Sequence, residues 1–331
     1  ILCIENDSIR DVYFDTFMNG TPNQDGFHTI LNTIKTNDYL WPESFTYGKV
    51  THEVVLHLLN VVDRYRDSLN LVNSHRSALK GAFLYQNMKY PNKTAAIRMG
   101  DSRRVKKISC ENLYLKVLAI AHRRSMNVYK NLAIQRIQAL YNDEQAFEPT
   151  IENQGLEWDN PIQLFWGVDI DLENNSETVE YHSSAKFPHA GIGMLRNYNC
   201  ENTEEFGLMG FIGGAHYVHS HLTGIEMELY GSGMVMGAGS GDPKASSARS
   251  SDVYRNYHRI YAGHNTVIIN GDSKGTHPGS WKWDNILYQD KSEIIGVEPN
   301  INMDQTNSDG PFYPVSDNFS FVTVELDDNV N

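Results

Sequence analysis

The stretch YGKVTHEVVLHLLNVVDRY, residues 47–65, decides how the first half of the chain folds. Apolar or aromatic residues recur in it every three or four positions, at Tyr47, Val50, Val54, Leu58, Val61 and Tyr65. That spacing puts them on one face of an α-helix, so the sequence predicts a helix whose stripe packs on neighbouring elements.

Outward from this helix the pattern changes once along the chain. Residues 112–141 predict more helix with a break near Ser125, and a short helix follows Asn160-Pro161 as far as Trp166. After about Gly167, short segments rich in β-branched and aromatic residues alternate with Gly, Asn, Asp and Ser clusters. These predicted strands cover residues 178–182, 191–197, 225–230, 259–269 and 319–326. The sequence therefore predicts an α+β chain of two domains, 1–170 and 171–331, with the boundary within 167–176.

Composition excludes several classes of protein. The 331 residues are 40% apolar without a run of eighteen apolar residues, so no membrane span is expected. The net charge of −13 argues against a general nucleic-acid binder, and it would also repel an acidic polymer unless a cleft is locally basic. Three cysteines are too few for a disulfide framework. Because the chain starts without methionine and ends just after a predicted strand, we expect a fragment truncated at both ends.

Three histidines lie within six positions in the stretch AHYVHSH, residues 215–221. Side chains alternate across a strand, so His219 and His221 would project to one side and His216 to the other. Two neighbouring imidazoles can divide the work between proton exchange and metal binding. Asp242 and His264 could supply further oxygen and nitrogen ligands, a donor set that suits zinc.

Three segments together resemble the heparinase II/III-like polysaccharide lyases, in particular the alginate lyase-like branch. They are FPHAGIGMLR (187–196), His219-x-His221 leading into a strand that ends Glu228-Leu-Tyr-Gly, and HNTVIING (264–271). The resemblance implies an incomplete toroid of paired helices followed by a large antiparallel β-sandwich. It also implies cleavage of uronate-containing polysaccharides by β-elimination, in a secreted or periplasmic protein.

The resemblance assigns roles to residues of this chain. His219 is implied to be catalytic, and His221 and His264 are implied to bind the same metal. Two departures stand out: Thr223 occupies a position where the family has aspartate, and Gly237, Ala238 and Gly239 lie where the family's Asp-Pro-Gly is expected. Asp242 fits that motif only after a short insertion, and an Asn-His pair of the family would fall before Ile1.

The helical half contributes Trp41-Pro-Glu-Ser-Phe-Thr-Tyr47, which resembles the segment that carries the family's catalytic tyrosine. Tyr47 is thus the expected acid, and also a candidate base, with His219 as base or carboxylate partner. Candidates for sugar stacking or carboxylate binding are Trp41, Arg103, Arg196 and Tyr261, although packing or solvated surface is the better explanation of each from the sequence alone.

The resemblance implies an acidic, uronate-containing polysaccharide as the partner, with alginate first because several branches of the family act on it. Other uronate polymers, such as heparan-type glycosaminoglycans or ulvan, are the alternatives within the family. A divalent metal, zinc first, is expected to brace the site rather than to take part in the chemistry. Two alternatives of another class are a non-catalytic carbohydrate-binding protein and a zinc hydrolase. The oligomeric state stays open, a homo-oligomer included.

Overall fold

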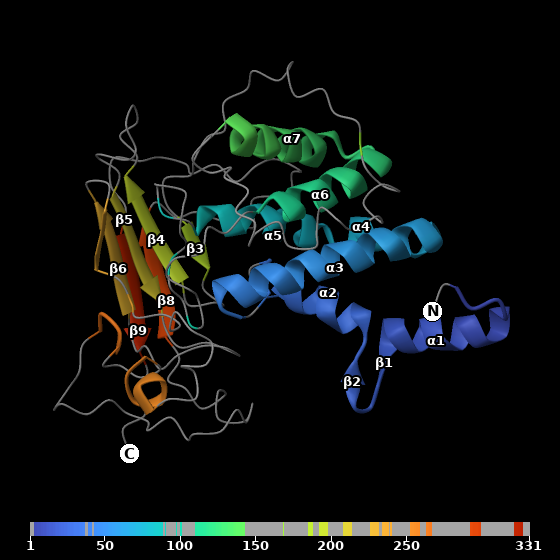
Figure 1. The fold of residues 1–331 in the computed structure, drawn as a ribbon, viewed down its shortest axis with the longest axis horizontal. Helices are drawn as coiled ribbons and strands as arrows, with labels where there is room; N and C mark the ends of the chain where they lie inside the picture. The colour runs from blue at the N-terminus through green and yellow to red at the C-terminus, as the bar shows by residue number, and fades with distance from the viewer. Residues whose placement is uncertain are drawn as a thin grey trace.

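The computed structural model describes residues 3–36, 39–41, 43–88, 90, 97, 100, 110–142, 168, 185–187, 192–197, 208–213, 226–231, 234–237, 239, 252–258, 263–266, 292–298 and 321–326. Helices fill the described part of the first half, and antiparallel strands dominate that of the second. In Figure 1 the helices lie on one side and the sheet on the other, with α3 running through the middle of the helical part.

The helical part consists of α1 (Asp7–Asn19), α2 (Phe27–Thr36), α3 (Phe45–Tyr65), α4 (Leu71–Ser74), α5 (Arg76–Asn87), α6 (Glu111–Arg123) and α7 (Asn127–Asn142), with a short hairpin of β1 (Gly20–Thr21) and β2 (Gln24–Asp25) and a 3₁₀ turn at Asp67–Leu69. Helix α1 begins where the Asn6 side chain accepts a hydrogen bond from the Ile9 N–H, which satisfies one of the free donors of the first turn. Ser125 separates α6 from α7 in the left-handed region, with φ of 55°. The break near Ser125 is thus confirmed.

Helix α3 is confirmed, but its buried face differs from the predicted stripe. Val50 and Val54 are 50% and 53% exposed, whereas Leu56 and Leu59 are fully buried. The buried face also carries charged and polar residues, including the ion pair of Lys49 with Glu53. Because Lys49 and Glu53 pair with each other, and His52 and Asp63 bond to other segments, this face is buried despite its polar groups, and counting apolar residues alone selected the wrong side of the helix.

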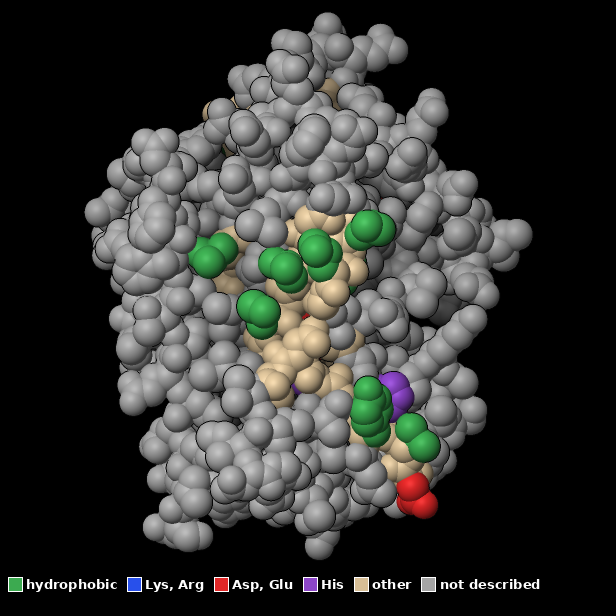
Figure 2. Space-filling model, turned by 90° about the vertical axis from the view of Figure 1, so that its left-hand side faces the viewer, with side chains coloured by type: hydrophobic (Ala, Val, Ile, Leu, Met, Phe, Trp, Pro, Cys, Tyr) green, Lys and Arg blue, Asp and Glu red, His purple; other side chains and the backbone are tan. Residues whose placement is uncertain are grey.

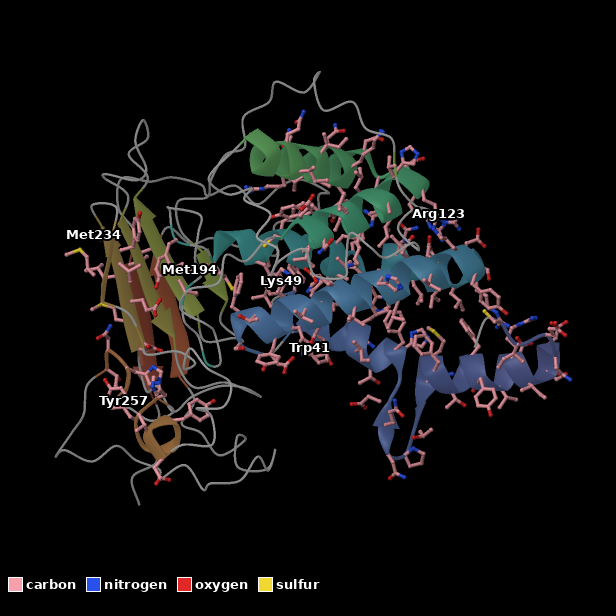
Figure 3. The ribbon with its side chains drawn as sticks, in the orientation of Figure 1. Trp41, Lys49, Arg123, Met194, Met234 and Tyr257 are labelled. Atoms are coloured by element: carbon pink, nitrogen blue, oxygen red, sulfur yellow. The ribbon has the colours of Figure 1, made fainter. Side chains whose placement is uncertain are left out.

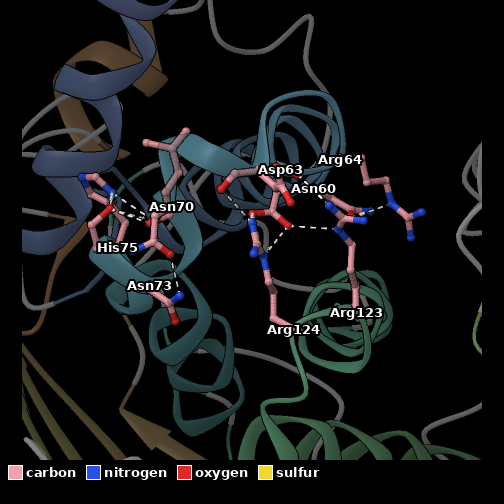
Figure 4. Close-up of polar contacts among 11 residues, drawn as sticks. Asn60, Asp63, Arg64, Asn70, Asn73, His75, Arg123 and Arg124 are labelled. Atoms are coloured by element: carbon pink, nitrogen blue, oxygen red, sulfur yellow. Dashed lines mark hydrogen bonds and ion pairs between the residues drawn. The ribbon is translucent and has the colours of Figure 1, made fainter.

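An aspartate joins α3 to the end of α6. Asp63, 1% exposed, accepts hydrogen bonds from Arg123 Nε at 3.2 Å and from Arg124 Nε at 2.8 Å (Figure 4). The Arg123 guanidinium also donates to the Asp63 carbonyl oxygen at 2.9 Å. Hydrogen bonding to Asp63 raises the pKa of Arg124. Two cations on the α6–α7 turn therefore compensate one buried carboxylate on α3.

His52 is a buried histidine on the inner face of α3. Its Nε2 donates to the Ala78 carbonyl oxygen of α5 at 2.7 Å, and its ring meets the Tyr85 ring edge-on at 5.5 Å between centroids. No described residue bonds to its Nδ1. Burial lowers the pKa of His52 to about 4, so the ring is neutral in the folded protein at neutral pH.

Acidification should therefore weaken the fold through His52. The unfolded chain takes up this proton near pH 6.5 while the folded protein does not until about pH 4. His52 contributes its full stability above pH 6.5, and the free energy of unfolding falls between pH 6.5 and 4 by about 3 kcal/mol from this residue alone. Urea unfolding of wild type and His52→Gln, compared at intervals between pH 7 and 4, measures the effect.

The exposed His122 provides the matched control. His122→Gln should retain the wild-type pH dependence, whereas His52→Gln, which keeps a donor toward Ala78, should flatten it. Because burial also lowers the pKa of His57 and His75, only the difference between variant and wild type isolates His52. Equal slopes for His52→Gln and wild type would contradict the expectation.

The sheet part has a five-stranded antiparallel sheet in the order β3-β4-β5-β6-β7. Its strands are β3 (Ala185–Phe187), β4 (Ile192–Asn197), β5 (Leu208–Gly213), β6 (Glu226–Gly231) and β7 (Met234–Gly237). A second sheet pairs β8 (Ser292–Glu298) with β9 (Phe321–Leu326) and lies against β4. A single π-helical turn spans Tyr254–His258.

The two faces of β6 and β7 differ in chemistry. Met194 and Tyr230 belong to the same buried cluster as the helical core, so this face of the sheet packs on the helices. Met227, Met234 and Met236 are more than half exposed on the opposite face. Figure 3 shows Met234 pointing away from the helices and Met194 toward them, and Figure 2 shows the hydrophobic side chains on the outer face.

Most other sequence expectations have a clear outcome. Strands near residues 191–197, 225–230 and 319–326 are confirmed as β4, β6 and β9. Within 259–269 the described residues 263–266 form a turn rather than a strand. The expected strand at 178–182, the short helix at 160–166 and nearly all of the expected boundary lie outside the described residues. None of the described helices combines the length and apolarity that crossing a membrane requires.

Candidate functional site

The segment before α3 is held by three hydrogen bonds, one within the segment and two to helices. Trp41 Nε1 donates to Glu43 Oε2 at 2.7 Å, and the Thr51 hydroxyl donates to the same oxygen at 3.2 Å. The backbone N–H of Trp41 donates to the Tyr85 hydroxyl at 3.4 Å. Trp41 and Glu43 are thus held on the first turns of α3 and against α5.

Gly48 allows the segment before α3 and the Tyr85 side chain to lie close to the α3 backbone. A Cβ at this position would lie 3.2 Å from the Trp41 carbonyl oxygen and 3.3 Å from the Tyr85 hydroxyl. Burial raises the pKa of Tyr85, so its hydroxyl stays protonated at neutral pH. Because Tyr85 is only 2% exposed and its hydroxyl accepts the Trp41 N–H, it supports the segment before α3 from inside the protein.

Tyr47 lies on α3 one turn before Thr51, so the two share a helix face with the Glu43 carboxylate beside them. The residue is half-buried, and Val50 on the same side is exposed. The end of α3 that carries Tyr47 is the end nearer the sheet, and Trp41 lies below that helix (Figures 1 and 3). A phenol on this face is within reach of a ligand from solvent.

Two glutamates occupy the inner face of β6. Glu226 and Glu228 are each 1% exposed, and with Tyr230 they form the buried positions of a strand whose alternate residues face outward. Carboxylates are costly to bury unless they are paired or bind a cation. Each of the two therefore requires a partner.

Glu228 is satisfied by groups from two other segments. The Tyr90 hydroxyl, a few residues beyond α5, donates to its Oε2, and the Gly239 backbone N–H donates to its Oε1 at 2.9 Å. The Tyr90 and Tyr230 rings stack at 5.7 Å between centroids. Glu228 thus fastens the helical part and the segment after β7 to the same strand.

Glu226 faces a histidine. His264 Nδ1 lies 2.8 Å from Glu226 Oε1, and its Nε2 lies 3.0 Å from the His258 carbonyl oxygen. The backbone adds a tie at the same place, because the Met227 N–H donates to the Asn265 carbonyl oxygen at 3.0 Å. The turn at residues 263–266 is therefore anchored to β6.

His264 can serve as a metal ligand in this arrangement. A carbonyl oxygen only accepts hydrogen bonds, so Nε2 carries a hydrogen, and Nδ1 is the ring nitrogen that faces Glu226. Fixing one ring nitrogen on a backbone carbonyl is the usual support of a metal-bound histidine. Among the described residues no group of three metal-binding side chains is assembled, and a complete site would need ligands from elsewhere in the chain.

The other predicted site residues divide into two groups. Trp41, Tyr47 and His264 are described, and the backbone of Arg196 lies in β4. The remainder lie outside the described residues: Arg103, His216, His219, His221, Asp242 and Tyr261. Neither Glu226 nor the Tyr90–Glu228 contact was predicted from the sequence. Strand β6 directly follows the histidine cluster, and this proximity was the available signal for its two glutamates.

Two comparisons find sequence similarity to ulvan lyases. The family described as endo-acting ulvan lyase second domain matches residues 37–181. An endo-acting ulvan lyase of Formosa agariphila is 36% identical over 332 residues, which cover 100% of this chain. The chain spans 39% of the length of that relative.

A solved structure also resembles the chain. It is a heparinase III, the BT4657 gene product with methylated lysines, with a TM-score of 0.43 and 13% sequence identity. The alignment covers 81% of this chain and 34% of the heparinase.

Proposed function

We propose that this chain is part of a polysaccharide lyase that cleaves ulvan by β-elimination. The observation that carries the proposal is the 36% identity to an endo-acting ulvan lyase along the whole of this chain. The match of residues 37–181 to a domain of such lyases supports it independently of the histidine motifs. Both matches support the ulvan alternative better than alginate, which the sequence analysis placed first.

The reaction needs three groups. A cation or hydrogen-bond donors neutralise the uronate carboxylate, a base removes the C5 proton, and an acid protonates the C4 oxygen. The electron pair of the C5–H bond forms the C4=C5 double bond while the C4–O bond breaks, and the departing oxygen leaves with the proton of the acid. No redox partner is required.

Tyr47 is our proposal for the acid, and also for the base if the C5 proton and the leaving oxygen lie on one face of the sugar. Its half-buried position on an accessible face of α3 supports this role. His219 is proposed as base or carboxylate partner on the strength of its motif. Trp41, held by Glu43 at the same end of α3, is proposed to contact the sugar, and Arg103, Arg196 and Tyr261 stay further candidates.

We also propose a divalent metal, zinc first, held by His221 and His264 with a carboxylate that the sequence analysis assigned to Asp242. The fixed tautomer of His264 supports this site. When bound, the metal would tie the 263–266 turn to the segment before β6 and so brace the strand that presents His219.

The finer fold remains part of the proposal. The exposed methionines on β6 and β7, together with a second sheet lying against β4, support a β-sandwich after a helical toroid. Export to the periplasm or the medium is proposed because a large polysaccharide is met outside the cell.

The test is ultraviolet absorbance of the unsaturated uronate during incubation of the complete protein with ulvan, alginate, heparan sulfate and hyaluronan in parallel. We expect absorbance to rise with ulvan and to stay flat with the other three polymers, since the sequence matches are with ulvan lyases. A rise in absorbance with alginate alone would instead support alginate as the substrate, as first expected from the sequence. Flat traces with all four from a folded, metal-loaded protein would favour a hydrolase or a binding module.

A further inference from the structure

The contact between Glu226 and His264 needs a cation. Nε2 of His264 donates its hydrogen to the His258 carbonyl, so the Nδ1 lone pair is directed at Glu226 Oε1, 2.8 Å away. Two lone pairs at that distance repel unless a proton or a metal ion lies between them. The two side chains are 0% and 2% exposed, so water does not relieve the repulsion.

Gly239 leaves room for the Glu226 carboxylate. A Cβ at residue 239 would lie 1.9 Å from Glu226 Oε1 and 3.3 Å from His264 Nδ1. The carboxylate of Glu226 thus fills the space that a side chain at position 239 would take, beside the nitrogen of His264. Any other residue at 239 would have to displace it.

Glu226 and the neighbouring Glu228 differ in their hydrogen-bond partners. Glu228 lies on the same face of the same strand with the same burial, but its two oxygens are taken by the Tyr90 hydroxyl and the Gly239 N–H. Glu228 needs no cation. Glu226, in contrast, faces the Nδ1 nitrogen of His264, which can itself bind a metal.

We propose that Glu226 is the carboxylate ligand of the metal site, in place of Asp242. This inference rests on the metal site proposed above and not on the identity of the polysaccharide. Glutamate oxygen and histidine nitrogen are both zinc ligands with bonds of roughly 2.0–2.2 Å. In a tetrahedral site two such ligand atoms lie roughly 3.3 Å apart, so the observed pair has to open by only about half an ångström.

Metal binding itself is the readout. The complete protein is stripped with a chelator, reloaded with Zn²⁺ and analysed for metal content and thermal unfolding. We expect about one zinc per chain in wild type and a rise in melting temperature of about 5 °C at a zinc concentration near 100 times Kd. Glu226→Gln should weaken zinc binding by at least about a hundredfold.

Two matched variants separate this proposal from its rivals. Glu228→Gln removes an equally buried carboxylate from the same strand and should keep the zinc. Asp242→Asn should also keep it. Loss of zinc in Asp242→Asn with full binding in Glu226→Gln would overturn the inference.

A relocated carboxylate tests the geometry directly. Glu226→Ala with Gly239→Asp removes the carboxylate from β6 and rebuilds it from position 239, where an added Cβ lies within 1.9 Å of the original oxygen. We expect this double variant to bind zinc at least about tenfold more tightly than Glu226→Ala alone. Equal affinity of the single and double variants would argue against it.

The remaining outcome concerns wild type. Suppose that reloaded wild type holds no zinc and that neither the chelator nor Zn²⁺ changes its melting temperature. Glu226 and His264 then form an ion pair that shares a proton, and the inference fails. The absorbance assay with ulvan distinguishes this from failure of the proposed function, because a lyase without a metal would still form unsaturated product.

Discussion

A Tyr47→Phe variant of the complete protein should lose lyase activity on ulvan by about a thousandfold or more, with the loss in kcat and little change in KM. The variant removes one oxygen, so the ring continues to pack at the head of α3 while the proton donor for the C4 oxygen disappears. If the same hydroxyl also serves as the base, both proton transfers fail together. Initial rates of ultraviolet absorbance over a range of ulvan concentrations give kcat and KM separately.

Tyr65→Phe is the matched control for this prediction. Tyr65 lies at the opposite end of the same helix, half-buried, with its ring 5.4 Å from that of Phe14. Its variant should keep wild-type kcat on ulvan. Retained activity in Tyr47→Phe, with an unchanged circular dichroism spectrum, would remove Tyr47 from the proposed mechanism.

The sequence predicted the helix around Tyr47 but not which side of it is buried. Leu56 and Leu59 form the buried face together with polar residues such as His52. Periodicity identifies a helix because the spacing of 3.6 residues is a local property. Which stripe is buried depends on partners from α5 and α6 that are distant in the sequence, such as the Ala78 carbonyl that receives the His52 hydrogen bond.

Strand β6 is a second element whose buried side could not be predicted from the local sequence pattern. Alternating glutamate and apolar residues over residues 226–230 ordinarily indicate a strand with its carboxylates in water. Here Glu226 and Glu228 are buried and Met227 is 51% exposed. The reversal follows from the partners Tyr90, Gly239 and His264, which come from three separate segments. Departures from local pattern are expected at functional sites, so the reversal itself supports a role for Glu226.

The histidine motifs could be read from the sequence because their residues lie close together along the chain. His264 was selected as a metal ligand from its motif, and the structure gives it a fixed tautomer suited to that role. The carboxylate beside it was assigned to Asp242 because aspartate lay nearest the expected spacing. The position of the Gly239 backbone against Glu226 depends on the tertiary structure, and it supports our proposal that Glu226, rather than Asp242, is the carboxylate ligand.

Removing both arginines that hold Asp63 should destabilise the protein more than removing Asp63 itself. Arg123→Met with Arg124→Met leaves a 1% exposed carboxylate without the two guanidinium groups that bond to it, which should lower the free energy of unfolding by about 3–5 kcal/mol. Asp63→Asn should cost less, about 1–2 kcal/mol, because the Arg123 and Arg124 side chains are 32% and 20% exposed and reach water. Urea unfolding monitored by far-ultraviolet circular dichroism measures both.

Adding Asp63→Asn to the double arginine variant is the decisive comparison. Because it removes the uncompensated charge, the triple variant should be more stable than the double variant by at least about 1 kcal/mol. Asp11→Asn is the control: it breaks a surface pair with Arg66, whose side chains are 37% and 54% exposed, and it leaves the Arg66 guanidinium over the Phe14 ring, so it should cost less than about 1 kcal/mol. A triple variant less stable than the double variant would mean that packing of the arginine stems, rather than compensation of the buried charge, holds α3 to the α6–α7 turn.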